Sequence, residues 1–180
     1  TRALGIDDGS GIVSGHAYAI DEIRRIEEKH RVEFKSASTR TAVIYFLLLN
    51  GHFAADTPNS QVLGLAYRGS SIVLFRETLE SLCEGQARAL CDLTEATIII
   101  HELGHLLGLV NGGTPMTTAH HDAEHGAHDT NPECVMYFAH ATLTPKDILD
   151  AKRSGAGSAT AYLFDQTCLD DIRAVREGAR

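Results

Sequence analysis

Two histidines and a glutamate stand close together in residues 97–109, in the pattern His-Glu-x-x-His. His101 and His105 are four positions apart, so on a helix both side chains lie on one face and can point at a common ion. Two neutral imidazoles at this spacing suit zinc, and Glu102 stands where a carboxylate can activate a zinc-bound water. The spacing therefore predicts a metal centre at which water is the reacting molecule.

The residues around this motif argue against the simplest alternative, which is two solvated histidines on a surface helix. The flanking side chains are apolar almost all round the helix, which is typical of a buried helix. Unpaired polar groups in such a helix are costly, and a metal ion supplies their partner. We predict that the helix begins between Glu84 and Arg88 and runs to Leu107, with Gly108 as its left-handed cap.

The composition is that of an ordinary globular protein, with 43% hydrophobic and 22% charged residues. A length of 180 residues predicts a single domain over residues 1–180 with a core of its own. The formal net charge of −8 argues against nucleic acid or an anionic membrane surface as the partner. The longest apolar run, residues 42–49, fits a buried strand and is too short to span a membrane. A monomer is the simplest expectation.

The four cysteines carry a separate prediction. Their number is even and no Cys-x-x-Cys pair is present, which argues against a four-thiolate zinc site. We expect two disulfides in an extracytoplasmic or secreted protein, Cys83 with Cys91 and Cys134 with Cys168, and four buried free thiols are the alternative. The chain begins at Thr1 rather than at a methionine, so we expect a mature or trimmed fragment without its targeting segment.

The remaining sequence predicts the elements that must position the motif helix. Apolar periodicity, strand-forming residues and turn residues define them. In chain order they are a helix over 17–30, a buried strand over 41–50, a loop over 51–60, strands over 62–67 and 72–76 joined by a hairpin-like turn, a helix start at 143–148, and a last helix over 169–176.

Beyond the second histidine, the sequence resembles the metzincin metallopeptidases. Their motif continues as His-Glu-x-x-His-x-x-Gly-x-x-His and is followed by a methionine turn. The pattern matches as far as Gly108, whereas Asn111 holds the place of the third histidine. Residues 134–137, Cys-Val-Met-Tyr, are similar to the methionine turn of matrixins and archaemetzincins. In both groups the third histidine stands eight residues before the methionine, and His128 stands eight before Met136.

The resemblance therefore implies that residues 109–127 are an insertion before the third ligand. It gives His101, His105 and His128 as the ligands of one zinc ion, Glu102 as the base, and Met136 as a structural residue beneath the metal. The insertion leaves alternatives open, because its imidazoles and carboxylates are also zinc ligands by type. His125 is the foremost of these alternatives for the third ligand, followed by His120, His121, Asp122 and Glu124. A second zinc ion in this segment is a further alternative, although a plain hydrophilic loop ranks ahead of it.

The same resemblance implies a fold and an activity. The fold is α+β, with a small twisted, mostly parallel or mixed sheet, a backing helix, an active-site helix, the methionine turn and C-terminal helices. The activity is that of a zinc-dependent endopeptidase, in which Glu102 activates a zinc-bound water. An extended peptide substrate would align along strand 72–76 as the sheet edge. The alternative is a non-catalytic or self-inhibited zinc-binding module whose inserted loop closes the metal site.

Overall fold

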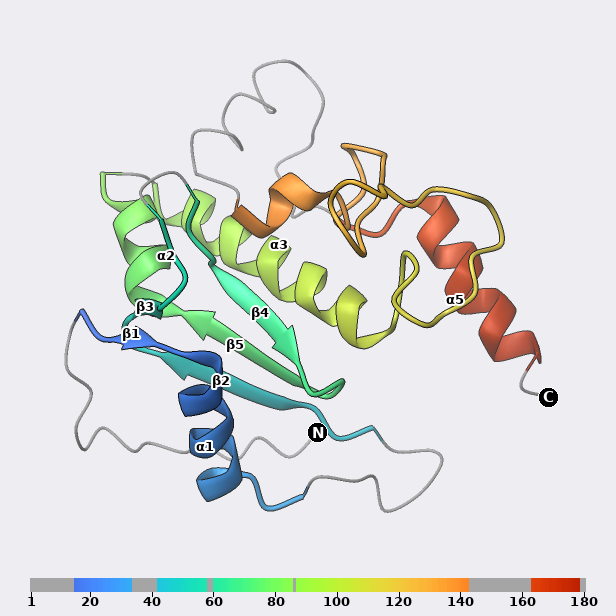
Figure 1. The fold of residues 1–180 in the computed structure, drawn as a ribbon. Coiled ribbons are helices and arrows are strands. Elements are labelled where there is room, and N and C mark those ends of the chain that lie inside the picture. Colours follow the sequence, from blue (N-terminus) through green and yellow to red (C-terminus); the bar gives the residue numbers. More distant parts are fainter. Residues whose placement is uncertain (1–14, 34–41, 58–59, 86, 143–162, 179–180) are drawn as a thin grey trace.

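The computed structural model describes residues 15–33, 42–57, 60–85, 87–142 and 163–178. Its elements, in chain order, are β1 (Ala17–Tyr18), α1 (Ile20–His30), β2 (Tyr45–Leu49), β3 (His52–Phe53), β4 (Gly64–Tyr67), β5 (Ser71–Phe75), α2 (Arg76–Cys83), α3 (Arg88–Leu106), the 3-10 helix η1 (Phe138–Thr142) and α5 (Gln166–Gly178) (Figure 1). This arrangement confirms the predicted α+β class. None of the described helices is long and apolar enough to cross a membrane.

The main sheet has three strands in the order β2-β5-β4. β2 runs parallel to β5, and β4 pairs with β5 in the antiparallel sense expected of a hairpin. The expectation that strand 72–76 forms the sheet edge is wrong, because β5 is the central strand and β4 lies at the edge. All five residues of β5 are buried, as is typical of a strand with neighbours on both sides and layers on both faces.

A second, two-stranded sheet corrects the predicted loop over residues 51–60. β3 lies inside that range and pairs in parallel with β1, in the register Ala17 with His52 and Tyr18 with Phe53. Helix α2 was also not predicted as an element. It follows β5 without a break and leads the chain back towards the start of α3.

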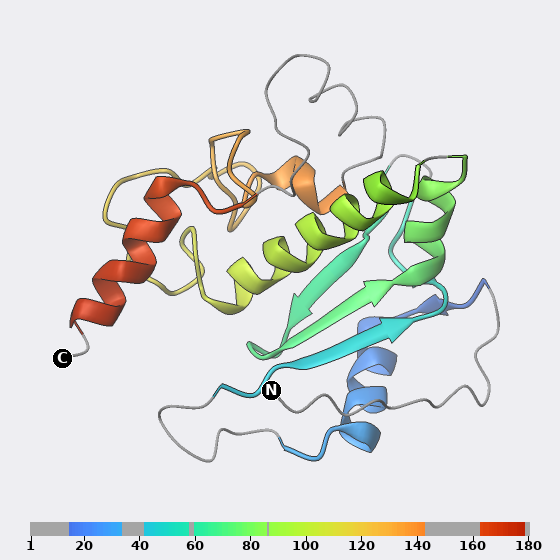
Figure 2. The ribbon, with the colours of Figure 1, turned by 180° about the vertical axis from the view of Figure 1, so that it is seen from behind.

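Helices α1 and α3 cover opposite faces of the main sheet, as two views from opposite sides show (Figures 1 and 2). On one face, Ile23 of α1 belongs to a buried apolar cluster that includes Val73 and Phe75 of β5. On the other face, Ile98 of α3 packs with Ile72 and other residues of the sheet. The motif helix therefore rests on an apolar platform, which holds its polar residues in place.

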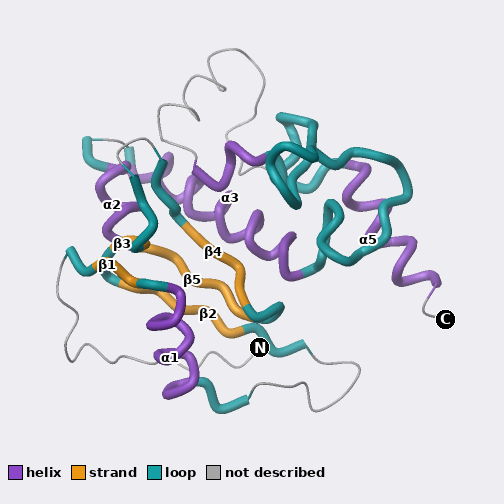
Figure 3. The backbone as a smooth tube through the Cα atoms, viewed as in Figure 1, coloured by secondary structure: helices purple, strands orange, loops and turns teal. Residues whose placement is uncertain are grey.

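Beyond α3 the chain runs mainly through loops before η1 and α5, as the tube in Figure 3 shows. A third buried cluster lies here, formed by Leu109, Val110, Cys134, Val135, Met136 and Cys168. The last helix is longer than predicted and runs from Gln166 to Gly178. The predicted helix start at 143–148 lies outside the described residues.

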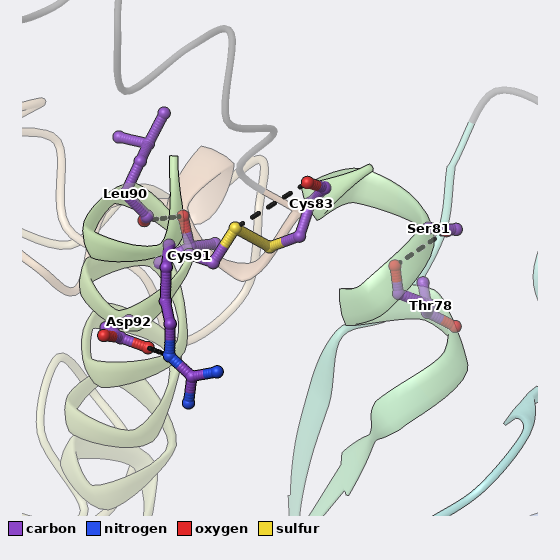
Figure 4. The surroundings of a disulfide bond; sticks show 8 residues. Thr78, Ser81, Cys83, Leu90, Cys91 and Asp92 are labelled. Atoms are coloured by element: carbon purple, nitrogen blue, oxygen red, sulfur yellow. Dashed lines mark hydrogen bonds and ion pairs between the residues drawn. A yellow bond between two sulfur atoms is a disulfide. The ribbon is translucent and has the colours of Figure 1, made fainter. Parts of the chain in front are cut away.

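The cysteines confirm one of the two expected disulfides. Cys83 at the end of α2 is bonded to Cys91 in the first turns of α3, so the bond joins these two helices (Figure 4). The second expected bond is absent, because Cys134 and Cys168 are free and buried, with their sulfur atoms 3.7 Å apart. A disulfide is typical of an oxidising compartment, and the extracytoplasmic location stays a prediction.

Candidate metal centre

Three histidines converge beside helix α3. His101 and His105 come from α3, and His128 comes from the segment after it. One ring nitrogen of each lies within 4.8 Å of those of the other two. The Nε2 atoms of His101 and His105 are 3.1 Å apart. Among the described residues, no cysteine, aspartate, glutamate or fourth histidine joins this group.

In His101 and His128, a hydrogen bond made by Nδ1 determines which ring nitrogen is free to bind a metal. Nδ1 of His101 donates a hydrogen bond to the carbonyl oxygen of Val135 at 2.7 Å, and Nδ1 of His128 donates to that of His125 at 2.5 Å. Since a carbonyl can only accept, Nδ1 carries the proton and Nε2 keeps its lone pair. Nε2 of His128 is buried without a hydrogen-bond partner. A zinc ion fits this donor set and supplies that partner.

The surroundings keep the rings of His101 and His105 neutral. Burial, followed by the charge of His105, lowers the pKa of His101 to about 3. Burial and the charge of His128 lower the pKa of His105 to about 4. Only a neutral imidazole offers a lone pair to a metal. Both rings are therefore neutral at neutral pH, and each offers one nitrogen lone pair to a metal.

Glu102 lies between α3 and the edge strand. It is buried, at 3% exposure, and its Oε2 accepts a hydrogen bond from the backbone N–H of Ala66 in β4 at 2.6 Å. Burial raises the pKa of Glu102 to about 7, although the bond from Ala66 acts in the opposite direction. A carboxyl group with this pKa can both take up and return a proton near neutral pH.

Gly64 is the reason that β4 can approach α3 so closely. A Cβ atom at this position would lie 2.8 Å from the Cγ2 atom of Ile98 in α3 and 3.2 Å from the Cγ atom of Glu102. Any larger residue would push the strand away from the helix. The short hydrogen bond between Ala66 and Glu102 therefore depends on a glycine two positions earlier.

Gly104 has the corresponding role on the other side of α3. A Cβ atom there would overlap the sulfur of Met136 and lie 2.9 Å from the ring of Phe164. Met136 is completely buried, and the turn that contains it, closed by the bond from Tyr137 N to Cys134 O, thus packs directly on the helix. Sequence reasoning missed this position. The signal was a glycine in a helix interior, which costs about 1 kcal/mol relative to alanine and so needs a reason.

The other histidines of residues 109–127 point to partners of their own. His125 pairs with Asp122 at 2.7 Å, and its ring stacks on that of Phe138 with the centroids 3.6 Å apart. Nε2 of His121 donates to the carbonyl oxygen of Gly126. The structure therefore brings His128, and not these alternatives, to the two histidines of α3.

His120 links three segments around His128. Its Nδ1 lies 2.6 Å from Oδ2 of Asp129, and its Nε2 lies 2.9 Å from Oδ2 of Asp171 in α5. Both carboxylates are completely buried. Burial alone lowers the pKa of His120, but the hydrogen bonds and charges of the two carboxylates outweigh it and raise that pKa. The ring of His120 thus holds Asp129, the residue next to His128, and sequence reasoning gave His120 no such role.

A comparison with known families adds an independent observation. Residues 49–123 match the family model described as zincin-like metallopeptidase. No curated protein and no solved structure matches the chain. The zincin-like segment contains β4, β5 and the His-Glu-x-x-His helix, and it ends before His128. It supports a zinc-dependent peptidase of the zincin type. The position of His128 beside His101 and His105 comes from the structure alone.

Proposed function

We propose that this protein is a zinc-dependent endopeptidase of the metzincin type, with His101, His105 and His128 as the zinc ligands. The observation that carries the proposal is the convergence of the three ring nitrogens within 4.8 Å, although His128 stands 23 positions beyond His105. Three protein ligands leave a coordination position for water, which is typical of catalytic zinc.

The remaining residues have roles that follow from their contacts. When bound, zinc lowers the pKa of a coordinated water molecule and polarises the peptide carbonyl. Glu102 takes the proton of the attacking water as that oxygen adds to the carbonyl carbon, and it passes the proton to the amine as the C–N bond breaks. The N–H of Ala66, bonded to Oε2 of Glu102, holds the carboxylate in its orientation. We assign the methionine turn to residues 134–137, where the carbonyl oxygen of Val135 orients His101.

A peptide substrate is expected to lie along β4. This strand borders the site, because its Ala66 bonds to Glu102, and its other side is paired with β5. Addition of an extended peptide to a sheet edge uses backbone hydrogen bonds and engages residues on both sides of the cleaved bond. That geometry favours an endopeptidase with broad backbone recognition.

The alternative, a zinc module closed by the inserted loop, requires a fourth protein ligand. The loop residues that could supply it, His125 and Asp122, are bonded to each other. A structural zinc site also has no use for a base such as Glu102 with a pKa of about 7. These observations favour the open, catalytic site.

The test is digestion of a mixed peptide library by the zinc-loaded protein, with wild type beside Glu102→Gln. Glutamine keeps an oxygen for the N–H of Ala66 but cannot take up a proton. We expect cleavage to fall by about 10²- to 10⁴-fold while zinc content stays the same. Equal cleavage by both proteins would overturn the role of Glu102.

The third ligand is tested by zinc affinity in a matched pair of variants. His128→Ala should lose much of the affinity because it removes one of three ligands. His125→Ala changes a neighbouring histidine that pairs with Asp122 instead, and it should bind zinc as wild type does. Tight binding by the His128 variant together with loss in the His125 variant would reverse the assignment.

A further inference from the structure

A second group of metal-ligating side chains lies behind the turn of Met136, apart from the three histidines. Asp129, Cys134, Asp165 and Cys168 each offer one ligand atom, and these four atoms lie within 4.8 Å of one another. We propose that they form a second, structural zinc site. It would join the segment that follows His128, the turn after it, and the start of α5.

The spacing of the two sulfur atoms suits a shared metal ion. The Sγ atoms of Cys134 and Cys168 are 3.7 Å apart. Two thiolates that bind one tetrahedral zinc at the usual bond length of about 2.3 Å must be separated by about 3.8 Å. A disulfide would require about 2.05 Å. The two cysteines therefore stand at the separation of zinc ligands.

The carboxylates complete a four-ligand set. Oδ2 of Asp129 lies 3.7 Å from the sulfur of Cys168, and Oδ1 of Asp165 accepts a hydrogen bond from the backbone N–H of Cys168. Asn131 donates to both carboxylates, from its backbone to Asp129 and from its side chain to Asp165. A carboxylate accepts up to four such contacts, so these bonds orient the oxygens and leave lone pairs for a metal. Zinc accepts both thiolate and carboxylate ligands, and four protein ligands are typical of a structural zinc site.

Burial and charge support the same conclusion. Asp129, Cys134 and Cys168 are completely buried, as is the nearby Asp171. Within the described part of the chain, His120 is the only basic side chain paired with Asp129 and Asp171. Buried carboxylates need compensating charge. A zinc ion would bring two positive charges and displace one proton from each thiol, so two protons are released when it binds.

The zinc content of four proteins separates this site from the three-histidine centre. Wild type should hold two zinc ions, and His105→Ala and Cys168→Ser should each hold one. The double variant Cys83→Ser/Cys91→Ser is the matched control, because it removes the other two cysteines, and it should keep two zinc ions. One ion in wild type and none in His105→Ala would overturn the second site. One ion in both of these proteins would support it and contradict the three-histidine centre instead.

Cobalt substitution tests the site without changing a ligand. Co²⁺ bound to thiolates gives intense near-ultraviolet charge-transfer absorption, whereas histidine ligands do not. Wild type and His105→Ala loaded with Co²⁺ should both show this absorption. Alkylation of the chelator-treated, unfolded chain without a reductant should then label two thiols. Absence of the band, or no labelled thiol because Cys134 and Cys168 form a disulfide, would overturn the proposal.

Discussion

The two sides of helix α3 are built by different means. On the side of the main sheet, apolar residues and regular strand pairing hold the helix, and the buried cluster around Ile98 is wholly hydrophobic. On the other side, the chain between α3 and η1 has isolated bridges in place of strands. A buried apolar cluster around Met136 packs here, and polar contacts join the loops to one another and to α5, among them those that His120 makes with Asp129 and Asp171.

Each of these two regions also contains a buried ionic network, and the two networks serve different purposes. In the sheet region, Arg31 pairs with Glu27 of α1 at 2.6 Å and donates to the hydroxyl of Ser71 in β5. This network ties a helix to a sheet that is already well packed. The His120 network instead fixes a loop that carries a candidate zinc ligand. The comparison indicates that the first contributes to global stability and the second to the geometry of the site.

The largest effect on stability is expected from Arg31→Met. The change leaves the completely buried carboxylate of Glu27 with the hydroxyl of Ser71 at 2.6 Å and the more distant cation of Arg68 at 3.6 Å. Loss of one partner of a buried pair costs about 4 kcal/mol, to be measured by urea unfolding followed by circular dichroism. Arg76→Met breaks an exposed pair with Glu80 and should cost less than about 1 kcal/mol. Equal costs would mean that burial does not distinguish the two pairs.

His120→Leu is expected to lower the free energy of unfolding less than Arg31→Met does, but to change local hydrogen exchange more. The variant removes the ring that bonds to two buried carboxylates, although Asp171 keeps its bonds from Thr117. We expect a loss of about 2 kcal/mol and faster hydrogen exchange in residues 117–130 and in α5, with the sheet unchanged. His121→Leu alters the adjacent histidine and should leave exchange in α5 unaffected. Uniform acceleration across the sheet would contradict the division into two regions.

The smallest expected effect is a coupling free energy, and it distinguishes the two glycines that border α3. Gly104→Ala forces Met136 to move, and Gly64→Ala forces β4 away from Ile98, each at a cost of about 1 to 3 kcal/mol. A second substitution, Met136→Ala, makes room beside position 104 only. It should therefore offset part of the cost of Gly104→Ala and none of that of Gly64→Ala. Unfolding of the three single variants and of the two double variants that combine Met136→Ala with each glycine substitution would measure this coupling.

Local sequence patterns predicted the features that depend on only a short stretch of the chain. The motif helix and its end were predicted, and Gly108 has the expected left-handed backbone with φ of 71°. His128 was predicted from the resemblance, which places the third histidine eight residues before Met136, and the structure brings it near His101 and His105. The placement of residues 72–76 at the sheet edge was wrong, although the unbroken apolar run of β5 was the signal of a central strand.

Long-range polar contacts were beyond sequence reasoning. His120 and Asp171 are 51 positions apart, and no periodic pattern relates them. The same holds for Arg31 and Ser71, which are 40 apart. A polar side chain gains its partner only when the apolar core has brought distant segments together. Such pairs can therefore be identified once the fold is known, but not from the sequence alone.

The inserted segment between His105 and His128 has a consequence for how metal sites of this kind can diversify. Both of its ends are fixed, by the bond from Thr114 N to Gly108 O at one end and by His120 at the other. The entropy of closing a loop grows only logarithmically with its length, by about 0.6 kcal/mol for each doubling. Lengthening the segment is thus thermodynamically cheap once its ends are anchored. A search pattern with a fixed spacing to the third histidine would pass over such a chain, whereas a pattern anchored on the methionine would find it.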